Sequence, residues 1–257
     1  MSEKIKKNAK TVDVFLKKFL NRQKYSALLS PMRYGTLTGG KKIRSTIIFN
    51  VAKIFKLKHN QIINACAAVE CIHSYSLIHD DLPCMDNDSL RRGKAATHTK
   101  FGESTAILAG NSLLTLAFEI IMDTKFKIRP DKKIFLTKRL AEYSGHTGIA
   151  GGQFLDLNYE NRKVGISSIL SMQKKKTGKL FEFCCLAPAI ISGSKNSVKK
   201  EVADLGEEIG LLFQIADDFL DLKGRKKNVG KPVNKDNKKG KSTLIKSLGY
   251  NRTLKFA

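Results

Sequence analysis

The chain has no tryptophan, only five prolines and five cysteines, and few acidic residues for its 257 positions. The cysteines are odd in number, and none belongs to a CxxC or Cys/His pattern with metal-ligand spacing. This argues against a disulfide framework and against a zinc site. A reducing compartment fits best, so we expect a cytoplasmic protein. The polar, lysine-rich first ten residues do not resemble a secretion signal.

Long apolar runs and internal repeats are absent as well. No uncharged apolar run approaches the roughly 18 residues that span a bilayer, so we expect no stable membrane insertion. The length suits one larger domain with a sizeable core, or two small ones. We expect a single domain over residues 1–257.

The charge is strongly one-sided, with 47 Lys and Arg against 23 Asp and Glu, a net charge of +24 and a pI near 9.9. Such a balance is typical of nucleic-acid binders, of proteins at anionic membranes, and of enzymes for phosphorylated substrates. Nucleic-acid surfaces favour Arg with interleaved aromatics, whereas here 37 lysines are scattered through every segment beside only 10 arginines. We therefore expect no nucleic-acid partner.

Apolar residues recur at three- and four-residue spacing in long segments bounded by Gly, Pro, Asn or charge clusters, which predicts helices. Alternating strand-like runs are scarce, so the sequence predicts an all-α fold with a buried bundle. Three connections rich in Gly, Asn and charge are predicted loops, at 30–42, 86–94 and 223–241. The predicted helical segments cover residues 12–20, 47–54, 62–82, 105–121, 134–143, 166–191 and 202–222.

The segment His79–Asp88 holds four carboxylates within nine residues, at the end of an apolar helix. They repel one another where the helix dipole is already negative, unless cations neutralise them. On an ideal helix Asp80 and Asp86 are roughly 120° apart, but Pro83 lies between them and can bend or end the helix. The sequence therefore predicts that both carboxylates face one metal ion; an acidic loop in solvent is the alternative.

A second acidic motif lies inside an apolar helix. Asp217 and Asp221 are four residues apart on one face, and Gln214 is on the same side. Carboxylates among apolar residues are costly to bury without cations, and Mg²⁺ accepts one or two carboxylates together with water and phosphate oxygens. Two such motifs on facing helices would hold a diphosphate through metal ions.

Basic residues at fixed positions supply donors for diphosphate oxygens. The glycine pair Gly39–Gly40 precedes a cationic turn, and Arg91 with Arg92 directly follows the first acidic motif. His73 lies two helical turns before Asp80 on the same face, which favours a place in the site over a role in the core. Further basic groups occur at Lys41, Lys42, Arg44, Lys174, Lys175, Lys176, Lys231 and Lys241.

In order and spacing these motifs resemble the bacterial trans-prenyltransferases, or polyprenyl diphosphate synthases, over nearly the whole chain. The resemblance implies an isoprenoid-synthase fold, a single domain of about ten helices around a central apolar cavity. The motifs are GGKKIR, VECIHSYSLIHDDLPCMDNDSLRRGKAATH, FGESTAILAGNSLLTLAF, GGQFLDL, KKTG, FQIADDFLDLKG and GKPVNKDNKKGKST.

In that family an allylic diphosphate ionises and isopentenyl diphosphate attacks the cation, so the resemblance implies farnesyl diphosphate as product, two or about three Mg²⁺ ions, and a homodimer. It implies metal binding by Asp80, Asp86, Asp217 and Asp221, with Lys176 beside the three catalytic carboxylates of Asp80, Asp86 and Asp217. For isopentenyl diphosphate it implies Lys41, Arg44, His73 and Arg92. For the allylic diphosphate it implies Arg91, Lys176, Thr177, Gln214, Lys231 and Lys241.

Product length in the family depends on bulk just below the first acidic motif. Tyr75, with the small Ser76 beside it, would form a floor that favours a C15 product. The chain departs from the family pattern at Ser45, where Pro is usual, and at Arg225 and Asn234 after the second motif. Family members continue beyond the position of Gly249 through further helices, so we expect a domain shortened at its C-terminus.

Rival interpretations remain open. A synthase of the same family could make a C10 or C20 product. A terpene cyclase is disfavoured, because such cyclases lack the Gly-Gly-Lys and Arg-Arg groups. A non-catalytic remnant that binds polyanions is the alternative outside enzymes.

Overall fold

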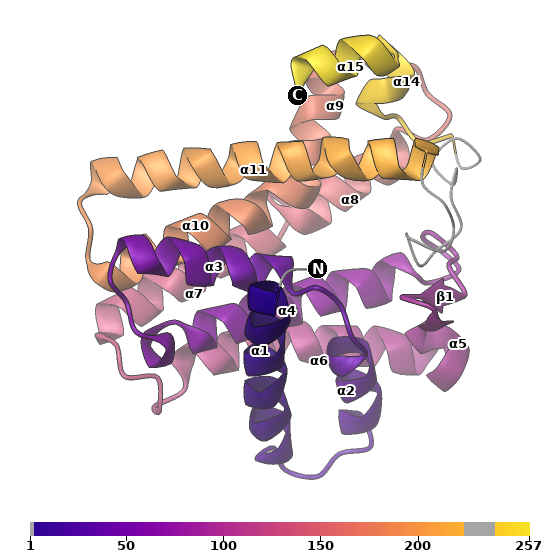
Figure 1. Ribbon diagram of the computed structural model, residues 1–257. Coiled ribbons are helices and arrows are strands. Elements are labelled where there is room, and N and C mark those ends of the chain that lie inside the picture. Colours follow the sequence, from indigo (N-terminus) through magenta and orange to yellow (C-terminus); the bar gives the residue numbers. More distant parts are fainter. Residues whose placement is uncertain (1–2, 224–239) are drawn as a thin grey trace. The chain divides into compact units, whose positions relative to one another are not determined.

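The computed structural model describes residues 3–223 and 240–257, which are mostly helical (Figure 1). Two compact units divide the chain. The first unit comprises Met1–Leu140 and Cys184–Lys199, and the second comprises Ala141–Phe183 and Lys200–Ala257. The predicted all-α fold is confirmed, because the described chain is built from helices and one two-residue hairpin.

The first unit is built around α4 (Ile63–Asp80), which is buried along nearly its whole length. Its first half is rich in small residues, and Ala65, Ala67 and Ala68 have no exposed surface. Small side chains let neighbouring helices approach closely, and α4 packs along α6 as well as against α1, α2 and α3. The remaining elements are α1 (Glu3–Asn21), α2 (Leu29–Leu37), α3 (Ile43–Ile54), η1 (His59–Gln61), β1 (Leu90–Arg91), β2 (Lys94–Ala95), α5 (Thr97–Phe101), α6 (Glu103–Met122) and α7 (Pro130–Ser144).

Among the described helices, α6 is the one that is long and apolar enough to cross a membrane by length and composition, with a mean hydropathy of 1.6. Its inner face is buried in the first unit, where Ala106, Ala109 and Leu113 have no exposed surface. A core helix passes the same test, and the packing of α6 on α4 gives it that role here.

The second unit has its own apolar core, formed by Ile169, Leu211, Ile215 and Leu244. The short helix α14 contributes Leu244, and the carbonyl oxygen of that residue accepts a hydrogen bond from Thr253 Oγ1 of α15. The chain end is thereby packed against α9 and α11. The elements are α8 (Ile149–Asn158), α9 (Ile166–Gln173), the π-helical turn η2 (Lys174–Gly178), α10 (Lys179–Ser192), α11 (Asn196–Lys223), α14 (Leu244–Leu248) and α15 (Tyr250–Phe256), with α10 and α11 divided between the units.

All seven predicted helical segments are found as helix, but the loop predicted at 30–42 is wrong over most of its length. Helix α2 occupies Leu29–Leu37, because Pro31 stands in its first turn, where its missing N–H costs little. Gly35 lies inside α2, since a Cβ there would come within 2.5 Å of Ile78 Cδ1. The glycine therefore allows close packing on α4 rather than a turn.

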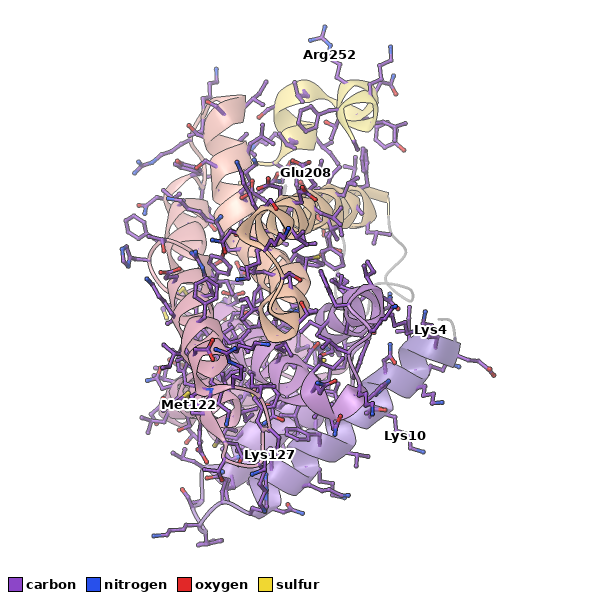
Figure 2. The ribbon with its side chains drawn as sticks, turned by 90° about the vertical axis from the view of Figure 1, so that its left-hand side faces the viewer. Lys4, Lys10, Met122, Lys127, Glu208 and Arg252 are labelled. Carbon is purple, nitrogen blue, oxygen red and sulfur yellow. The ribbon has the colours of Figure 1, made fainter. Side chains whose placement is uncertain are left out.

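Lysines of α1 lie in solvent, which accounts for part of the excess positive charge. Lys4 and Lys10 are exposed and project outward from the helix (Figure 2). The opposite face of α1 carries Val12 and Leu16, both without exposed surface. This amphipathic pattern explains why the helix forms without any role for its lysines in a site.

Candidate active site

The first acidic motif folds back on the end of α4. The helix ends at Asp80, as the position of Pro83 predicts, and the following turn returns the chain. The backbone N–H of Asp86 donates to the carbonyl oxygen of Asp80 at 2.8 Å, and that of Asp88 donates to Asp81 at 3.1 Å. The loop therefore brings the two predicted metal ligands, Asp80 and Asp86, side by side.

The other two carboxylates of this motif are bound by Arg91. The Arg91 Nε donates to both oxygens of Asp81 at 3.0 and 3.1 Å, and Asp88 Oδ2 lies 3.9 Å from Nη2. Burial alone would lower the pKa of Arg91, but the contact with Asp81 raises it above its ordinary value. Arg91, predicted to bind the allylic diphosphate, thus also fixes the acidic loop, a structural role that sequence reasoning missed.

A set of cationic groups lies beside the N-terminus of α3, where His73 of α4 and Arg92 of the hairpin turn come near Arg44. Burial, and then the charges of Arg44 and Arg92, hold the pKa of His73 well below its ordinary value. Arg92 donates to the carbonyl oxygen of Gly39. A Cβ at Gly40 would lie 2.6 Å from the Arg92 guanidinium carbon, so this position must be glycine.

Two lysines follow the glycine pair and have different surroundings. Lys41 is exposed, as a substrate-binding group can be in an open site. Lys42 is 4 % exposed, and its Nζ donates to the carbonyl oxygen of Thr36 at 2.7 Å and lies 3.5 Å from Asp13. Lys42 therefore holds the segment in place from inside.

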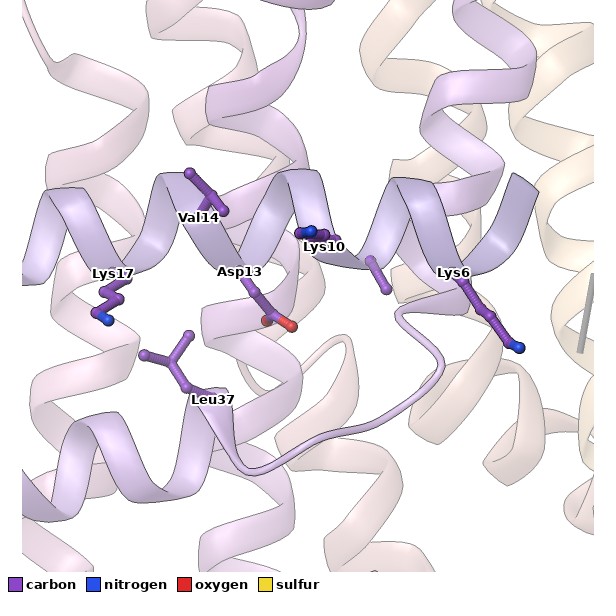
Figure 3. Close-up of a pocket in the computed structure, with 7 residues that line it drawn as sticks. Lys6, Lys10, Asp13, Val14, Lys17 and Leu37 are labelled. Carbon is purple, nitrogen blue, oxygen red and sulfur yellow. The ribbon is translucent and has the colours of Figure 1, made fainter. Parts of the chain in front are cut away.

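A groove of about 400 Å³ opens beside the same segment, along α1 and the end of α2 (Figure 3). Its wall is mostly apolar, from Ala9, Val14 and Leu37, with Lys6 and Lys10 at its edge. None of the predicted site residues lines it.

The predicted chain-length residues lie on α4 one to two turns before the first motif. Tyr75 is partly buried, and its ring meets the His79 ring edge-on with 5.1 Å between centroids. His79 is fixed in turn, because its Nε2 lies 3.0 Å from the carbonyl oxygen of Ile107 on α6. Ser76 Oγ donates to the carbonyl oxygen of His73.

In the second unit, the acidic motif on α11 separates into exposed and buried carboxylates. Asp217 is exposed and Asp221 partly buried, whereas Asp218 is 5 % exposed. The cost of burial expected for the motif therefore falls on Asp218, which accepts hydrogen bonds from Gln214 at 2.9 Å and from Gln173 at 3.2 Å.

This hydrogen-bond chain continues to a second predicted residue. Thr177 Oγ1 donates to Gln214 Oε1 at 2.8 Å, so Gln214 links Thr177 to the buried Asp218. Thr177 stands in the π-helical turn η2, and such turns often occur at functional sites. The structure thus brings the predicted pair Thr177 and Gln214 together, while Asp218 and Gln173 are supports that the sequence did not single out.

Two predicted lysines meet at one carboxylate oxygen. Lys176 Nζ and Lys241 Nζ each lie 2.7 Å from Asp156 Oδ2, and Lys241 also lies 2.9 Å from Glu160. Burial raises the pKa of Asp156, but the two ammonium groups outweigh it and hold the pKa below its ordinary value. Asp156 belongs to the GGQFLDL motif, the one sequence signal that could have identified it.

Close backbone packing places Lys176 at this carboxylate. A Cβ at Gly152 would lie 2.2 Å from the backbone nitrogen of Lys176, so only glycine lets α8 and η2 approach. Lys241 arrives from the other side, because Asn161 N donates to the carbonyl oxygen of Gly240 at 3.0 Å. The predicted residue Lys231, and the departures at Arg225 and Asn234, lie outside the described residues.

The donor set is suited to Mg²⁺. Each unit offers a pair of carboxylates, Asp80 with Asp86 and Asp217 with Asp221, and Mg²⁺ uses one or two carboxylates while water and phosphate complete its shell. Within residues 3–223 and 240–257 no group of three or more metal-binding side chains is preformed. A substrate phosphate would therefore be needed to complete such a site.

Comparisons with known proteins agree with the motifs. The sequence profile of the polyprenyl synthetase family, described as "Polyprenyl synthetase", matches residues 25–254. The chain is 41 % identical to the farnesyl diphosphate synthase of Escherichia coli over 232 residues, which cover 90 % of this chain and 78 % of the relative.

Two solved structures are similar over nearly the whole chain. The apo FPP/GFPP synthase of Zymomonas mobilis has a TM-score of 0.87 and 33 % identity, covering 98 % of this chain and 86 % of that one. The geranyltransferase of Helicobacter pylori, complexed with magnesium and isoprenyl diphosphate, has a TM-score of 0.84 and 28 % identity, with coverage of 100 % and 87 %.

Proposed function

The chain belongs to the polyprenyl synthetase family and is a prenyltransferase, and on this premise we propose that it condenses isopentenyl diphosphate with dimethylallyl or geranyl diphosphate, head to tail, to give farnesyl diphosphate. The observation that carries the proposal is the family match over residues 25–254, which includes both acidic motifs and the basic residues around them.

In the proposed reaction the carbon–oxygen bond of the allylic diphosphate breaks, and the diphosphate leaves with the electron pair. The double bond of isopentenyl diphosphate attacks the resulting cation, a carbon–carbon bond forms, and a proton is lost. The released diphosphate is an anion formed at the same place and can accept that proton. No side chain acts as a nucleophile.

Metal binding is assigned to one carboxylate pair in each unit, Asp80 with Asp86 and Asp217 with Asp221. Bound Mg²⁺, two or about three ions, would neutralise the charge that develops on the leaving diphosphate. The hydrogen bond between the backbones of Asp86 and Asp80 supports the first pair. The magnesium complex of the Helicobacter pylori relative supports the choice of ion.

The basic groups divide between two diphosphates. Lys41, Arg44, His73 and Arg92 are assigned to isopentenyl diphosphate, supported by the shared charge environment of the last three. For the allylic diphosphate we assign Arg91, Lys176, Thr177, Gln214, Lys231 and Lys241. A neutral His73 donates one hydrogen bond and adds no positive charge, so Arg44 and Arg92 carry the charge of the first group.

Product length is assigned to Tyr75, with Ser76 beside it. A growing prenyl chain that extends below the first acidic motif meets the Tyr75 ring, which is held against His79. An aromatic ring at this place leaves room for a short chain, so we propose a C15 product.

The protein is further proposed to act as a homodimer in the cytoplasm, as one domain over residues 1–257. One face of α6 carries apolar side chains in solvent, with Ile107 41 %, Leu108 52 % and Met122 49 % exposed. Exposed apolar patches of this kind are typical of interaction surfaces, and a second copy of the chain would cover this one.

A primer panel tests the proposal. The protein is incubated with Mg²⁺, isopentenyl diphosphate and one of dimethylallyl, geranyl or farnesyl diphosphate, and the dephosphorylated products are separated by chromatography. The proposal predicts a C15 alcohol from the first two primers and no extension of the third. A C20 product, or a stop at C10, would reassign the chain length. Salt-sensitive DNA binding without any product would favour the polyanion-binding alternative.

A further inference from the structure

Glu70 is a buried carboxylate that the proposed reaction does not use. It lies on α4, three residues before His73, and is 2 % exposed. A buried carboxylate is costly unless hydrogen bonds and opposite charges compensate it. Its Oε1 accepts from the backbone N–H of Ser45 at 3.1 Å and from Ser45 Oγ at 2.8 Å, while Lys42 Nζ lies 4.0 Å from Oε2.

These contacts cap the beginning of α3. Ser45 is the third residue of α3 (Ile43–Ile54), and the N–H groups of a first helical turn have no partner within the helix. A carboxylate is stabilised there by the positive end of the helix dipole. The Ser45 hydroxyl is also 3.1 Å from the carbonyl oxygen of Cys66, one turn before Glu70. One turn of α4 thereby holds one turn of α3.

The same carboxylate is the buried negative charge of the cationic set. Arg44 precedes Ser45 in the chain, and His73 follows Glu70 by one helical turn. The charge of Glu70 raises the pKa of Arg92, which burial and the neighbouring arginines lower. Cationic side chains that lie close together repel one another, so an anion beneath them is what lets them converge.

We propose that Glu70 is a positioning residue for the diphosphate of isopentenyl diphosphate. Through Ser45 it fixes the start of α3 and with it Arg44, and its charge offsets the repulsion among Arg44, Arg92 and Lys42. Glu70 itself does not touch the substrate. The inference rests on the proposed function, because it concerns the pocket assigned there to isopentenyl diphosphate.

The test compares Glu70→Gln, Ser45→Ala and the double variant by steady-state kinetics and by calorimetric titration with isopentenyl diphosphate. Gln keeps an acceptor oxygen and the volume but removes the charge, and Ala removes the hydroxyl but keeps the N–H. We expect KM and Kd for isopentenyl diphosphate to rise about tenfold in Glu70→Gln and about threefold in Ser45→Ala. The KM for geranyl diphosphate should stay within about twofold.

The matched control is Asn64→Ala on the same helix. Asn64 is 4 % exposed, and its Nδ2 donates to the carbonyl oxygen of Ile120 at 2.8 Å, away from the cationic set. This variant should lower Tm and leave both KM values unchanged. In the double variant, a loss smaller than the product of the single losses would show that Glu70 acts through Ser45.

The proposal is wrong if Glu70→Gln raises both KM values equally, or lowers Tm without changing the affinity for isopentenyl diphosphate. Failure of the proposed function looks different, since the wild-type protein would then show no condensation. The calorimetric comparison would still decide whether Glu70 governs diphosphate binding.

Discussion

Asp86 donates its backbone N–H to the carbonyl oxygen of Asp80 at 2.8 Å, and this contact closes the loop that follows α4. Two carboxylates that an ideal helix would place roughly 120° apart are thereby brought to the same end of the helix. The neighbouring Asp81 is held by Arg91, so its negative charge is compensated within the protein. The charge that calls for a metal ion is therefore that of Asp80 and Asp86.

Asp80→Asn and Asp86→Asn should each lower kcat by about a hundredfold or more, because the departing diphosphate loses metal-borne stabilisation. The Mg²⁺ concentration for half-maximal rate should rise in both. Magnesium titrations of the initial rate provide the measurement. Asp131→Asn, at an exposed carboxylate paired with Arg129, is the control. Equal magnesium requirements in all variants would remove these residues from the metal site.

Tyr75→Ala should lengthen the product beyond C15, since it removes the ring that faces His79 below the first motif. Chromatography of the dephosphorylated products measures the chain length directly. Tyr25→Ala, at a side chain that is 94 % exposed, is the matched control and should leave the product unchanged. An unchanged product in Tyr75→Ala would show that another residue limits the chain.

Asp156→Asn should lower the free energy of unfolding by about 3 kcal/mol, because two ammonium groups lose their shared buried counter-ion. The KM for the allylic diphosphate should rise as Lys176 and Lys241 move apart. Urea unfolding and steady-state kinetics measure the two effects. Glu160→Gln affects Lys241 alone, at a more exposed carboxylate, and should have a smaller effect on both. Equal effects of the two variants would contradict the central place of Asp156.

His73 predicts a loss of stability at mildly acidic pH. Burial and nearby arginines hold its folded-state pKa well below the ordinary value of 6.5, so below pH 6.5 the unfolded chain binds a proton that the folded chain does not. Its contribution to the free energy of unfolding should fall by about 1.4 kcal/mol per pH unit below 6.5. His73→Gln should remove that slope in urea unfolding between pH 7.5 and 5.5, whereas His146→Gln, at an exposed histidine, is the control. The same slope in His73→Gln would contradict this prediction.

The sequence predicted the helices and the meeting of Asp80 with Asp86, because periodicity and the position of Pro83 are local signals. It missed α2 and α8, where Gly35 and Gly152 resemble turn residues. In the structure these glycines allow a close approach to Ile78 and to the backbone of Lys176. Such contacts depend on which helices are neighbours, and this cannot be read from the segment itself.

The supporting carboxylates escaped sequence reasoning for the same reason. Glu70, Asp81 and Asp156 have partners 25, 10 and 20 residues away in the chain. Nothing local separates a buried structural aspartate such as Asp218 from the exposed Asp217 beside it. Burial distinguishes the two, and it depends on the packed unit.

The most direct test of the proposed function is the incorporation of radiolabelled isopentenyl diphosphate into an extractable product, with geranyl diphosphate as primer. The wild-type protein should produce labelled farnesyl diphosphate in the presence of Mg²⁺. Chelation with EDTA should abolish the product, and added Mg²⁺ should restore it. The absence of any magnesium-dependent incorporation by the folded protein would contradict the assignment.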